Sequence, residues 1–323
     1  MEIASFNVDS SLFEGESCRL DIYASSFLKM SRSRLKHGIK SVVVDGKKSK
    51  LSVKVSGGEN VEIQYEDPVP ENILPQEIPL QILYEDENTA VINKKQGMVT
   101  HPAAGNWSGT LVNALLFHWG CNSVFDAASV SKDPRRPGIV HRLDKDTSGV
   151  IITAKNKESE DWLQKQFQEK RVKKEYIAIV KGVPPAASGN IKTQIVRDPK
   201  NRKRFTTSDN PEVGKFSWTK YRCIGTYGQY SLMKLRLKTG RTHQIRVHMR
   251  HIGCPILGDP IYSRKDSLFP DATLMLHARK LCIRLPGSKD MSCFEAPVPV
   301  RFKRVLKVLH QKWEKHVFAK EPD

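Results

Sequence analysis

Blocks of apolar residues at regular spacing divide the chain into a small and a large part. In the small part, residues 18–66, apolar side chains recur at helical spacing over residues 20–28, which predicts a short amphipathic helix. A second, basic helix is predicted after Ser31, a residue type that caps helix N-termini. Alternating apolar positions over residues 42–63, interrupted by glycine-containing turns, predict a small sheet. Residues 1–17 show no periodicity, and we expect a poorly ordered tail there.

A proline-rich stretch, residues 67–79, separates the two parts. Its prolines fix φ and remove backbone donors, so we expect an extended linker and the domain boundary here. In the large part, residues 80–323, segments with a strand pattern outnumber helical segments and do not alternate with them. This order predicts an α+β fold rather than a parallel sheet built from βαβ units.

Apolar spacing in the large part predicts mostly strands, with helices between them. Strands are expected over residues 81–84, 90–93, 173–180, 216–224, 229–238 and 274–278. Helices are expected after Thr110 and over residues 155–170 and 300–317. Both faces of the segment 173–180 are apolar, so this strand is predicted to be central in its sheet.

The composition of the 323-residue chain points to a polyanionic partner. Lys and Arg number 53 against 35 Asp and Glu, which gives a net charge of +18 and a pI near 9.6. Nucleic acid and an anionic membrane would both fit that excess. The membrane is disfavoured, because no apolar run approaches the roughly 20 residues that span a bilayer and the acidic N-terminal stretch lacks the order of a signal peptide.

The cysteines form no Cys-x-x-Cys pair and are scattered, at Cys18, Cys121, Cys223, Cys254, Cys282 and Cys293. This scatter predicts neither a zinc site nor a disulfide framework. It fits a protein of the reducing cytoplasm best.

The densest polar stretch is a short loop that Gly138 and Gly149 bracket, between two apolar runs. The two glycines permit tight turns at both ends. Asp144 lies mid-loop, with Arg142 and Lys145 beside it. An Asp in such a turn is most often a solvated turn residue. A carboxylate kept ionised by close cations is also suited to act as a nucleophile or a base. Composition alone leaves both interpretations open.

The loop sequence His-Arg-Leu-Asp-x-x-Thr-Ser-Gly, residues 141–149, resembles the signature of the RluA-type pseudouridine synthases. Residues 174–180 and 237–262 resemble two further motifs of that family. Residues 82–102 resemble its first segment, except that Lys95 stands where the family commonly has proline. That departure predicts a less rigid loop at this point.

The resemblance implies roles for single residues. Asp144 would be the catalytic nucleophile, Arg246 would pair with it, and Tyr176 would lie in the active site against the target base. Arg142 would fill the space that the base vacates when it flips out. The remaining residues assigned to substrate binding are His141, Leu276 and Arg241.

Structural roles compete with several of these assignments. Tyr176 and Leu276 also fit a hydrophobic core, as apolar positions of strands. Thr242 is suited to cap a helix on which Arg246 would face a pocket, and an exposed Arg on that helix is the alternative. His243, in the same motif, is predicted to be structural rather than an acid or base.

The resemblance also implies a fold and a reaction. The fold is a mixed, mainly antiparallel sheet with helices on its outside and a cleft across the middle. The reaction is the isomerisation of uridine to pseudouridine in RNA, with no cofactor and no metal, and the subgroup with an N-terminal module favours large-subunit ribosomal RNA. We expect a cytoplasmic monomer that binds RNA and neither DNA nor a membrane.

The small part resembles the ribosomal-protein-S-four-like RNA-binding domain through residues 19–21, 31–34 and 44–47. Its turn has Asp-Gly where that family usually has Asn-Gly. The residues expected to bind phosphate lie on its second helix and on a basic turn of the large part: Arg32, Arg34, Lys36, Arg202, Lys203 and Arg204. A charge run of this kind is otherwise a solvated face.

Two other functions are compatible with parts of this pattern. A non-catalytic ribosome assembly factor would keep the basic surface and lack the Asp, Tyr or Arg of the motifs, all of which are present. A hydrolase could use Asp144 and Asp146 as a carboxylate pair. Their spacing within one turn does not place an acid and a base on opposite sides of a scissile bond.

Overall fold

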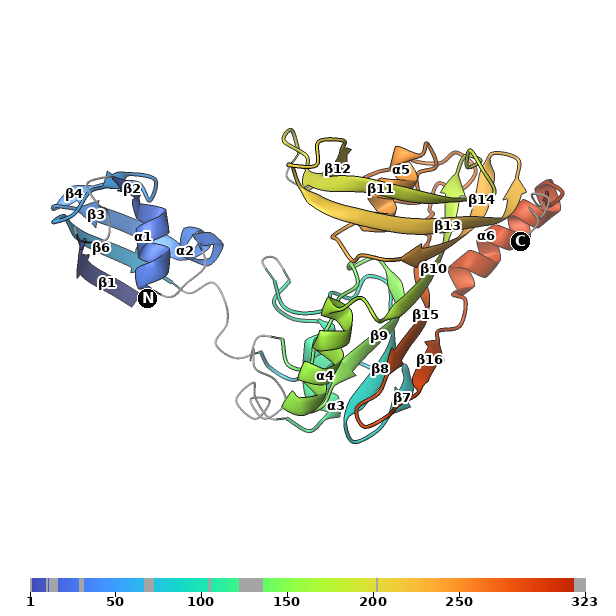
Figure 1. Ribbon diagram of the computed structural model, residues 1–323, viewed down its shortest axis with the longest axis horizontal. Coiled ribbons are helices and arrows are strands. Elements are labelled where there is room, and N and C mark those ends of the chain that lie inside the picture. The colour runs from blue at the N-terminus through green and yellow to red at the C-terminus, as the bar shows by residue number, and fades with distance from the viewer. Residues whose placement is uncertain are drawn as a thin grey trace. The chain divides into compact units, whose positions relative to one another are not determined.

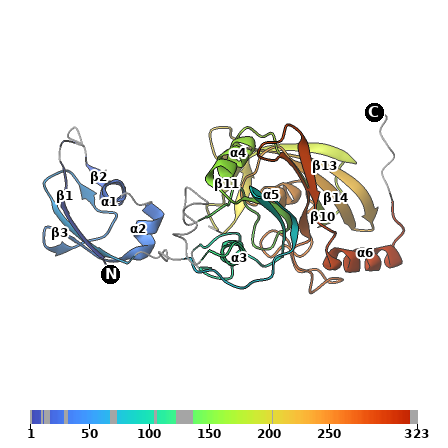
Figure 2. The ribbon, with the colours of Figure 1, turned by 90° about the horizontal axis from the view of Figure 1, so that it is seen from below.

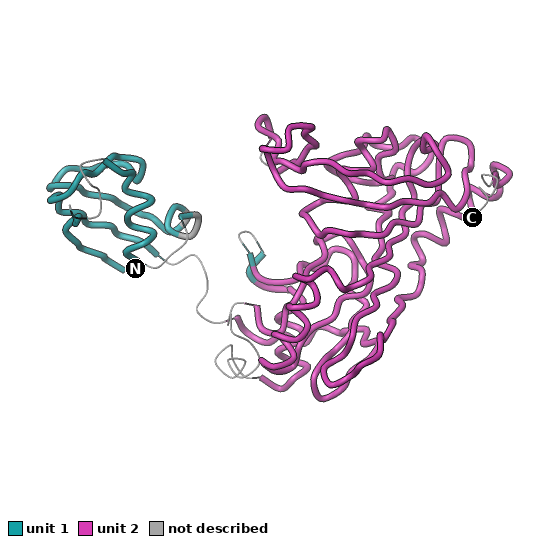
Figure 3. Tube along the Cα trace, in the orientation of Figure 1, with its two compact units in different colours: residues 1–72, 103–107 teal, residues 73–102, 108–323 magenta. Residues whose placement is uncertain are grey.

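The computed structural model describes residues 2–9, 11, 17–28, 32–66, 73–103, 106–121, 136–201 and 203–316. The chain forms two compact units (Figure 3). One comprises residues 1–72 with 103–107, and the other residues 73–102 with 108–323. The second unit carries every residue that the sequence predicts to be catalytic.

The first unit is a small sheet with two helices. Its four-stranded sheet has the order β1-β6-β3-β4, and a separate pair joins β2 to β5. The strands are β1 Glu2–Asn7, β2 Cys18–Arg19, β3 Ile39–Val44, β4 Lys47–Lys48, β5 Lys54–Val55 and β6 Asn60–Tyr65. The helices, α1 Leu20–Phe27 and α2 Arg32–Gly38, are the two that the sequence predicts.

The N-terminal strand corrects the expectation of a tail over residues 1–17. β1 pairs antiparallel with β6, beginning with Glu2 opposite Tyr65. Phe6 and Val8 are buried in the core of the unit. Only one side chain within β1 is buried, so a period-two pattern is too faint to read from the sequence.

The second unit is built on a ten-stranded sheet (Figure 1). The strand order is β12-β11-β13-β14-β10-β15-β9-β8-β7, with β16 paired to β15. All pairs are antiparallel except β9 with β15, which confirms the mixed, mainly antiparallel sheet. The strands are β7 Ile82–Glu85, β8 Thr89–Lys94, β9 Ser148–Ala154, β10 Lys173–Lys181, β11 Ser188–Arg197, β12 Phe205–Ser208, β13 Lys215–Tyr227, β14 Tyr230–Leu237, β15 Leu276–Arg284 and β16 Met291–Glu295.

Helices pack against this sheet. They are α3 Leu111–His118, α4 Lys157–Gln168, α5 Gln244–His251 and α6 Val300–Lys312. α4 contacts β9, α5 contacts β11 to β13, and α6 contacts β13. Figure 2 shows these helices together with the sheet. The predicted cap of α3 is confirmed. The Thr110 hydroxyl accepts from the backbone N–H of Asn113, whose side chain accepts from the Thr110 N–H in return.

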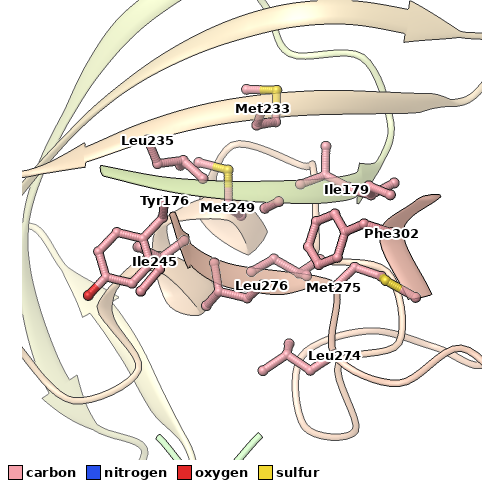
Figure 4. Packing of buried hydrophobic residues seen from close by; sticks show 14 of the residues in the cluster. Tyr176, Ile179, Met233, Leu235, Ile245, Met249, Leu274, Met275, Leu276 and Phe302 are labelled. Atoms are coloured by element: carbon pink, nitrogen blue, oxygen red, sulfur yellow. The ribbon is translucent and has the colours of Figure 1, made fainter. Parts of the chain in front are cut away.

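Strand β10 is central, as predicted, and its alternate residues face opposite sides. Tyr176 enters the main core beside Ile245 and Leu276 (Figure 4). Glu175 faces the other side, where it pairs with Lys234 at 2.7 Å and with Arg236 at 3.1 Å. The even-numbered residues at the start of β10 therefore face the core side of the sheet.

The second half of the proline-rich stretch belongs to the second unit. Ile73 is buried against α3, and the Asn113 amide donates to the Leu74 carbonyl oxygen at 2.7 Å. The linker expected over residues 67–79 is therefore too long. Residues 67–72 lie outside the described part of the chain.

One disulfide contradicts the expectation drawn from the scattered cysteines. Cys282 and Cys293 are joined, and they are opposite residues in the pairing of β15 with β16. Strand register brings them together, which no short-range spacing can show. Within the described ranges, no helix is long and apolar enough to cross a membrane.

Candidate active site

One cavity of about 450 Å³ collects the predicted catalytic and substrate-binding residues, namely Asp144, Tyr176, Arg246, Arg142, His141, Leu276 and Arg241. The loop before β9, strand β10 and the segment from Leu237 to Arg246 meet around it. Lys170, Lys174 and Lys238 also line it. Among the described residues of this lining, Asp144 alone carries a carboxylate, so the cavity is strongly cationic and suits a polyanionic substrate.

Glycines fix the path of the loop that carries Asp144. Gly149, where β9 begins, has φ of 118°, and a Cβ there would collide with the carbonyl oxygen of Ala278 on β15. Gly138 has φ of 71°, and a Cβ there would collide with the carbonyl oxygen of Ala154. Both positions need a residue without a side chain, as the sequence indicates.

The segment after β8 ties this loop down. The Lys94 ammonium, almost fully buried, donates to the carbonyl oxygens of Lys95 at 3.0 Å, Met98 at 2.8 Å and Lys145 at 3.2 Å. Two more side chains bond to loop carbonyls, Gln96 to Asp146 and Thr100 to Leu143. Burial lowers the pKa of Lys94 to about 7. Hydrogen bonds on both sides of Lys95 thus hold the segment where proline is absent.

Arg246 connects two carboxylates. One guanidinium nitrogen, Nη1, lies 3.5 Å from Asp144 Oδ2. Its Nε and Nη2 donate to the two oxygens of Asp259 at 2.7 and 2.8 Å, a bidentate pair. Asp259 is fully buried and also accepts from the backbone N–H groups of Ile261 and Tyr262. Burial alone would lower the pKa of Arg246, but the bonds from Asp259 and the charges of both carboxylates raise it.

His243 faces Asp144 from the same side. Its Nε2 lies 3.9 Å from Asp144 Oδ2, and its Nδ1 lies 2.9 Å from the Tyr262 hydroxyl. That hydroxyl accepts from the Phe205 N–H, so its proton is available to His243 Nδ1. A neutral His243 would then present Nε2–H toward the carboxylate. Burial lowers the pKa of His243, against the opposing charge of Asp144.

The start of α5 differs from the sequence prediction. The helix begins at Gln244, and its N-cap residue is His243 in the left-handed region, with φ of 56°, rather than Thr242. The Gln244 side chain accepts from the Arg241 N–H at 3.0 Å and donates to the Trp218 carbonyl oxygen at 3.1 Å. Its amide thereby fixes one rim of the cavity to β13.

Tyr176 forms part of the cavity wall while its ring packs in the core. It is 8% exposed and neighbours Ile245 and Leu276 (Figure 4). Burial, with the charge of Asp144 added, raises the pKa of its hydroxyl well above the usual value. The phenol is therefore protonated at neutral pH. The core and active-site interpretations of Tyr176 and Leu276 are both compatible with these positions.

His141 is held by the protein. Its Nε2 accepts from the Ile152 N–H at 3.0 Å, and its ring stacks on Phe167 with centroids 4.5 Å apart. Burial, together with the charge of Lys174, lowers its pKa to about 3. A neutral ring with one nitrogen already bonded serves best as a fixed wall of the cavity.

A model of the RNA pseudouridylate synthase family matches residues 88–251. This range includes both the loop that carries Asp144 and the helix α5 that carries Arg246. The chain belongs to the RNA pseudouridylate synthase family. It is of the RluA type, as its motifs indicate. The Borreliella burgdorferi protein named "Ribosomal large subunit pseudouridine synthase D" is similar, with 42% identity over 88% of this chain and 87% of that one. An uncharacterized RNA pseudouridine synthase of Aquifex aeolicus is 41% identical over 96% of this chain and 98% of its own.

Solved structures agree with the family. The human protein "RNA Pseudouridylate Synthase Domain Containing 4" superposes with a TM-score of 0.55 and 26% identity, over 71% of this chain and 93% of that one. The human protein "RNA Pseudouridylate Synthase Domain Containing 1" superposes with a TM-score of 0.56 and 25% identity, over 76% of this chain and 92% of that one. The sheet described above is thus the fold of pseudouridine synthases.

Several residues of this pseudouridine synthase site were missed at the level of sequence. Asp259 and Tyr262 lie in a stretch that resembles a family motif, but nothing in the sequence pairs Asp259 with Arg246. Lys94 reads as the polar end of a strand. From the sequence, Lys174 is one of two adjacent lysines that would be expected at the surface. Each was hidden because its partner or its burial comes from a distant segment.

Four of the residues predicted to bind RNA phosphates are described, Arg32 and Lys36 in the first unit and Lys203 and Arg204 in the second. Lys203 is exposed on the turn between β11 and β12, and Arg204 there lies 4.0 Å from Asp198. Arg32 pairs with Asp21 at 2.7 Å, and Lys36 is exposed on α2. Arg202 and the side chain of Arg34 lie outside the described residues.

Proposed function

We propose that this pseudouridine synthase modifies uridines of large-subunit ribosomal RNA and that Asp144 is its nucleophile. The observation that carries the nucleophile is the placement of Asp144, which reaches a cationic cavity and lies 3.5 Å from Arg246 Nη1. The substrate class rests on similar proteins, from Borreliella burgdorferi and Neisseria meningitidis, that are named large-subunit synthases.

The reaction needs a group that can carry charge at the reacting centre. The bond between N1 of uracil and C1′ of ribose breaks, the base turns, and a bond forms between C5 and C1′. The proton on C5 leaves, and N1 gains one. Asp144 would supply the electron pair, either to C6 of the base or to C1′. Arg246, aimed by Asp259, keeps that carboxylate ionised and oriented.

Tyr176 and Arg142 fit the handling of the base. The target must leave the stack, which costs a few kcal/mol. Tyr176 presents a protonated phenol and an aromatic ring beside Leu276, a surface on which uracil can pack. Arg142 is exposed and lines the cavity, which is compatible with a guanidinium that would fill the vacated stack.

Affinity for RNA would come from basic side chains outside the cavity. A second cavity of about 590 Å³ shares Gly240 and Arg241 with the first and reaches Lys215 and Arg197. Lys203 and Arg204, just before β12, would add positive charge on the second unit, and Arg32 and Lys36 would add it on the first. Phosphate contacts of this type give binding that weakens steeply with salt.

The test is the release of tritium from RNA labelled at C5 of uridine, with transcripts of large- and small-subunit ribosomal RNA as separate substrates. Wild-type protein should release tritium from the large-subunit transcript, and chemical mapping should place pseudouridine at discrete positions. Release from the small-subunit transcript alone would overturn the substrate assignment. Equal release by wild type and Asp144→Ala would overturn the nucleophile.

A further inference from the structure

Lys174 is one of the cavity's lysines that have no role in the reaction described above. Lys174 lies on β10 two residues before Tyr176, so both side chains face the same side of the sheet. Its neighbour across the sheet, Leu237 of β14, lines the cavity as well. Lys174 therefore lines the site from the β10 wall.

The charge of Lys174 has no counter-charge in the described part of the chain. No carboxylate of that part lies within ion-pair distance, and the centroid of the Phe167 ring lies 5.7 Å from Nζ. Other partly buried lysines differ. Lys181 pairs with Asp266 at 2.9 Å and Lys234 with Glu175 at 2.7 Å. Burial lowers the pKa of Lys174, and no acidic group among the described residues opposes that effect.

We propose that Lys174 binds a backbone phosphate of the RNA, one of the two that flank the target uridine. This inference rests on the proposed function. A desolvated ammonium without a partner is costly, and a phosphate oxygen supplies the missing charge and acceptor. Residues i and i+2 of a strand are roughly 6.6 Å apart. With the base against Tyr176, that spacing places Lys174 where a phosphate of the same nucleotide would lie.

Gly240 keeps the approach to Lys174 open. It lies shortly after β14, the strand that pairs with β10, and a Cβ built there would come 3.3 Å from Lys174 Nζ. Its φ is not in the left-handed region, so backbone conformation does not explain the glycine. The absence of a side chain leaves room for a ligand at the ammonium.

The test compares Lys174→Gln with Lys173→Gln, a matched control on the exposed, opposite side of β10. The substrate is a short ribosomal RNA that contains a uridine which the enzyme converts. Two variants of this RNA carry a neutral methylphosphonate linkage, one on the 5′ side of that uridine and one on its 3′ side. Wild type should lose about 10- to 100-fold in affinity on one of these two RNAs. Lys174→Gln should lose a similar factor in affinity for the RNA with only phosphate linkages. On the methylphosphonate RNA that wild type binds weakly, the variant should lose no further affinity.

Other readouts separate binding from folding and from the proposed reaction. Lys174→Gln should raise KM with little change in kcat and should lower the salt slope of binding by about 1, while Lys174→Arg should restore binding. Thermal melting checks that the variants fold. The proposal would be overturned if each methylphosphonate lowered the affinity of Lys174→Gln as much as it lowers that of wild type. It would also be overturned if Lys173→Gln lost as much affinity as Lys174→Gln. Wild type that binds the RNA but releases no tritium would contradict the proposed function, and the binding measurements would still decide the role of Lys174.

Discussion

The two walls of the cavity treat charge in opposite ways. On the α5 wall, Arg246 lies between Asp144 and Asp259, and both carboxylates are within 3.5 Å of it. On the β10 wall, Lys174 has no carboxylate partner among the described residues, and burial lowers the pKa of its ammonium. Charges that must hold their geometry before RNA arrives are paired within the protein. The charge on the other wall is left for the RNA to complete.

The largest expected effect is on the paired wall. Asp144→Asn removes the nucleophile while it keeps the shape, so tritium release should fall by at least about 10³-fold. Asp146→Asn, two residues along the same loop, is the matched control and should retain most of the activity. Comparable losses in both variants would point to a damaged loop instead of a lost nucleophile.

Asp259→Asn should show how far the pairing stabilises the fold. It leaves the buried Arg246 with Asp144 as its remaining carboxylate, so the free energy of unfolding should fall by about 3 kcal/mol, the lower part of the range for a broken buried pair. Denaturant unfolding measures this loss. The control is Glu295→Gln, which breaks two ion pairs at the surface, with Arg279 and Lys280, and should lower the free energy of unfolding far less. If Asp259→Asn and Glu295→Gln lowered the free energy of unfolding equally, the buried pair would stabilise the fold no more than the surface pairs.

How much of this could be read from the sequence depends on the range of each contact. Asp144 lies in a compact motif, and Arg246 in a second one, so local sequence sufficed to select them. The pairing of Arg246 with Asp259 needs the turn after α5. Burial of Lys174 needs β14 and the rim at Gly240, which are brought together only by the folded sheet. Patterns of short period carry no information on such contacts.

The same limit explains the errors in the fold. β1 has one buried side chain, and its strand character comes from β6, almost sixty residues later. The Cys282–Cys293 disulfide follows from the register of β15 with β16. By contrast, the strands with strong alternation and the capped helix α3 were visible, because their signals are local.

A pH titration of stability examines the neutral His141. Its pKa in the folded protein, about 3, lies below the ordinary value of 6.5. As the pH falls below 6.5, the unfolded chain takes up a proton that the folded protein does not. The free energy of unfolding should therefore fall by up to about 1.4 kcal/mol per pH unit from this group.

His141→Asn isolates that contribution. The variant should be less stable than wild type at pH 7, because the bond from the Ile152 N–H is weakened. The difference in the free energy of unfolding should shrink between pH 6.5 and pH 4, as measured by urea unfolding at each pH. A difference that stays constant over this range would mean that His141 is protonated in the fold.

The smallest expected effect concerns exposed cations. Lys203→Gln, on the turn between β11 and β12, should weaken RNA binding a few-fold and reduce the slope of log K against log salt by about 1. Lys307→Gln, on the exposed side of α6, is the control and should leave the slope unchanged. A matching decrease in both would assign the effect to net charge and not to a contact.

The most direct test of the division between the two walls is a single-turnover time course of tritium release at increasing enzyme concentration. It gives the rate constant at saturation and the apparent Kd separately. Asp144→Asn should abolish the rate constant and leave the Kd near the wild-type value. Lys174→Gln should keep the rate constant and raise the Kd. A Lys174→Gln protein with a wild-type Kd and a low saturating rate constant, or an Asp144→Asn protein with an unchanged rate constant, would contradict the account.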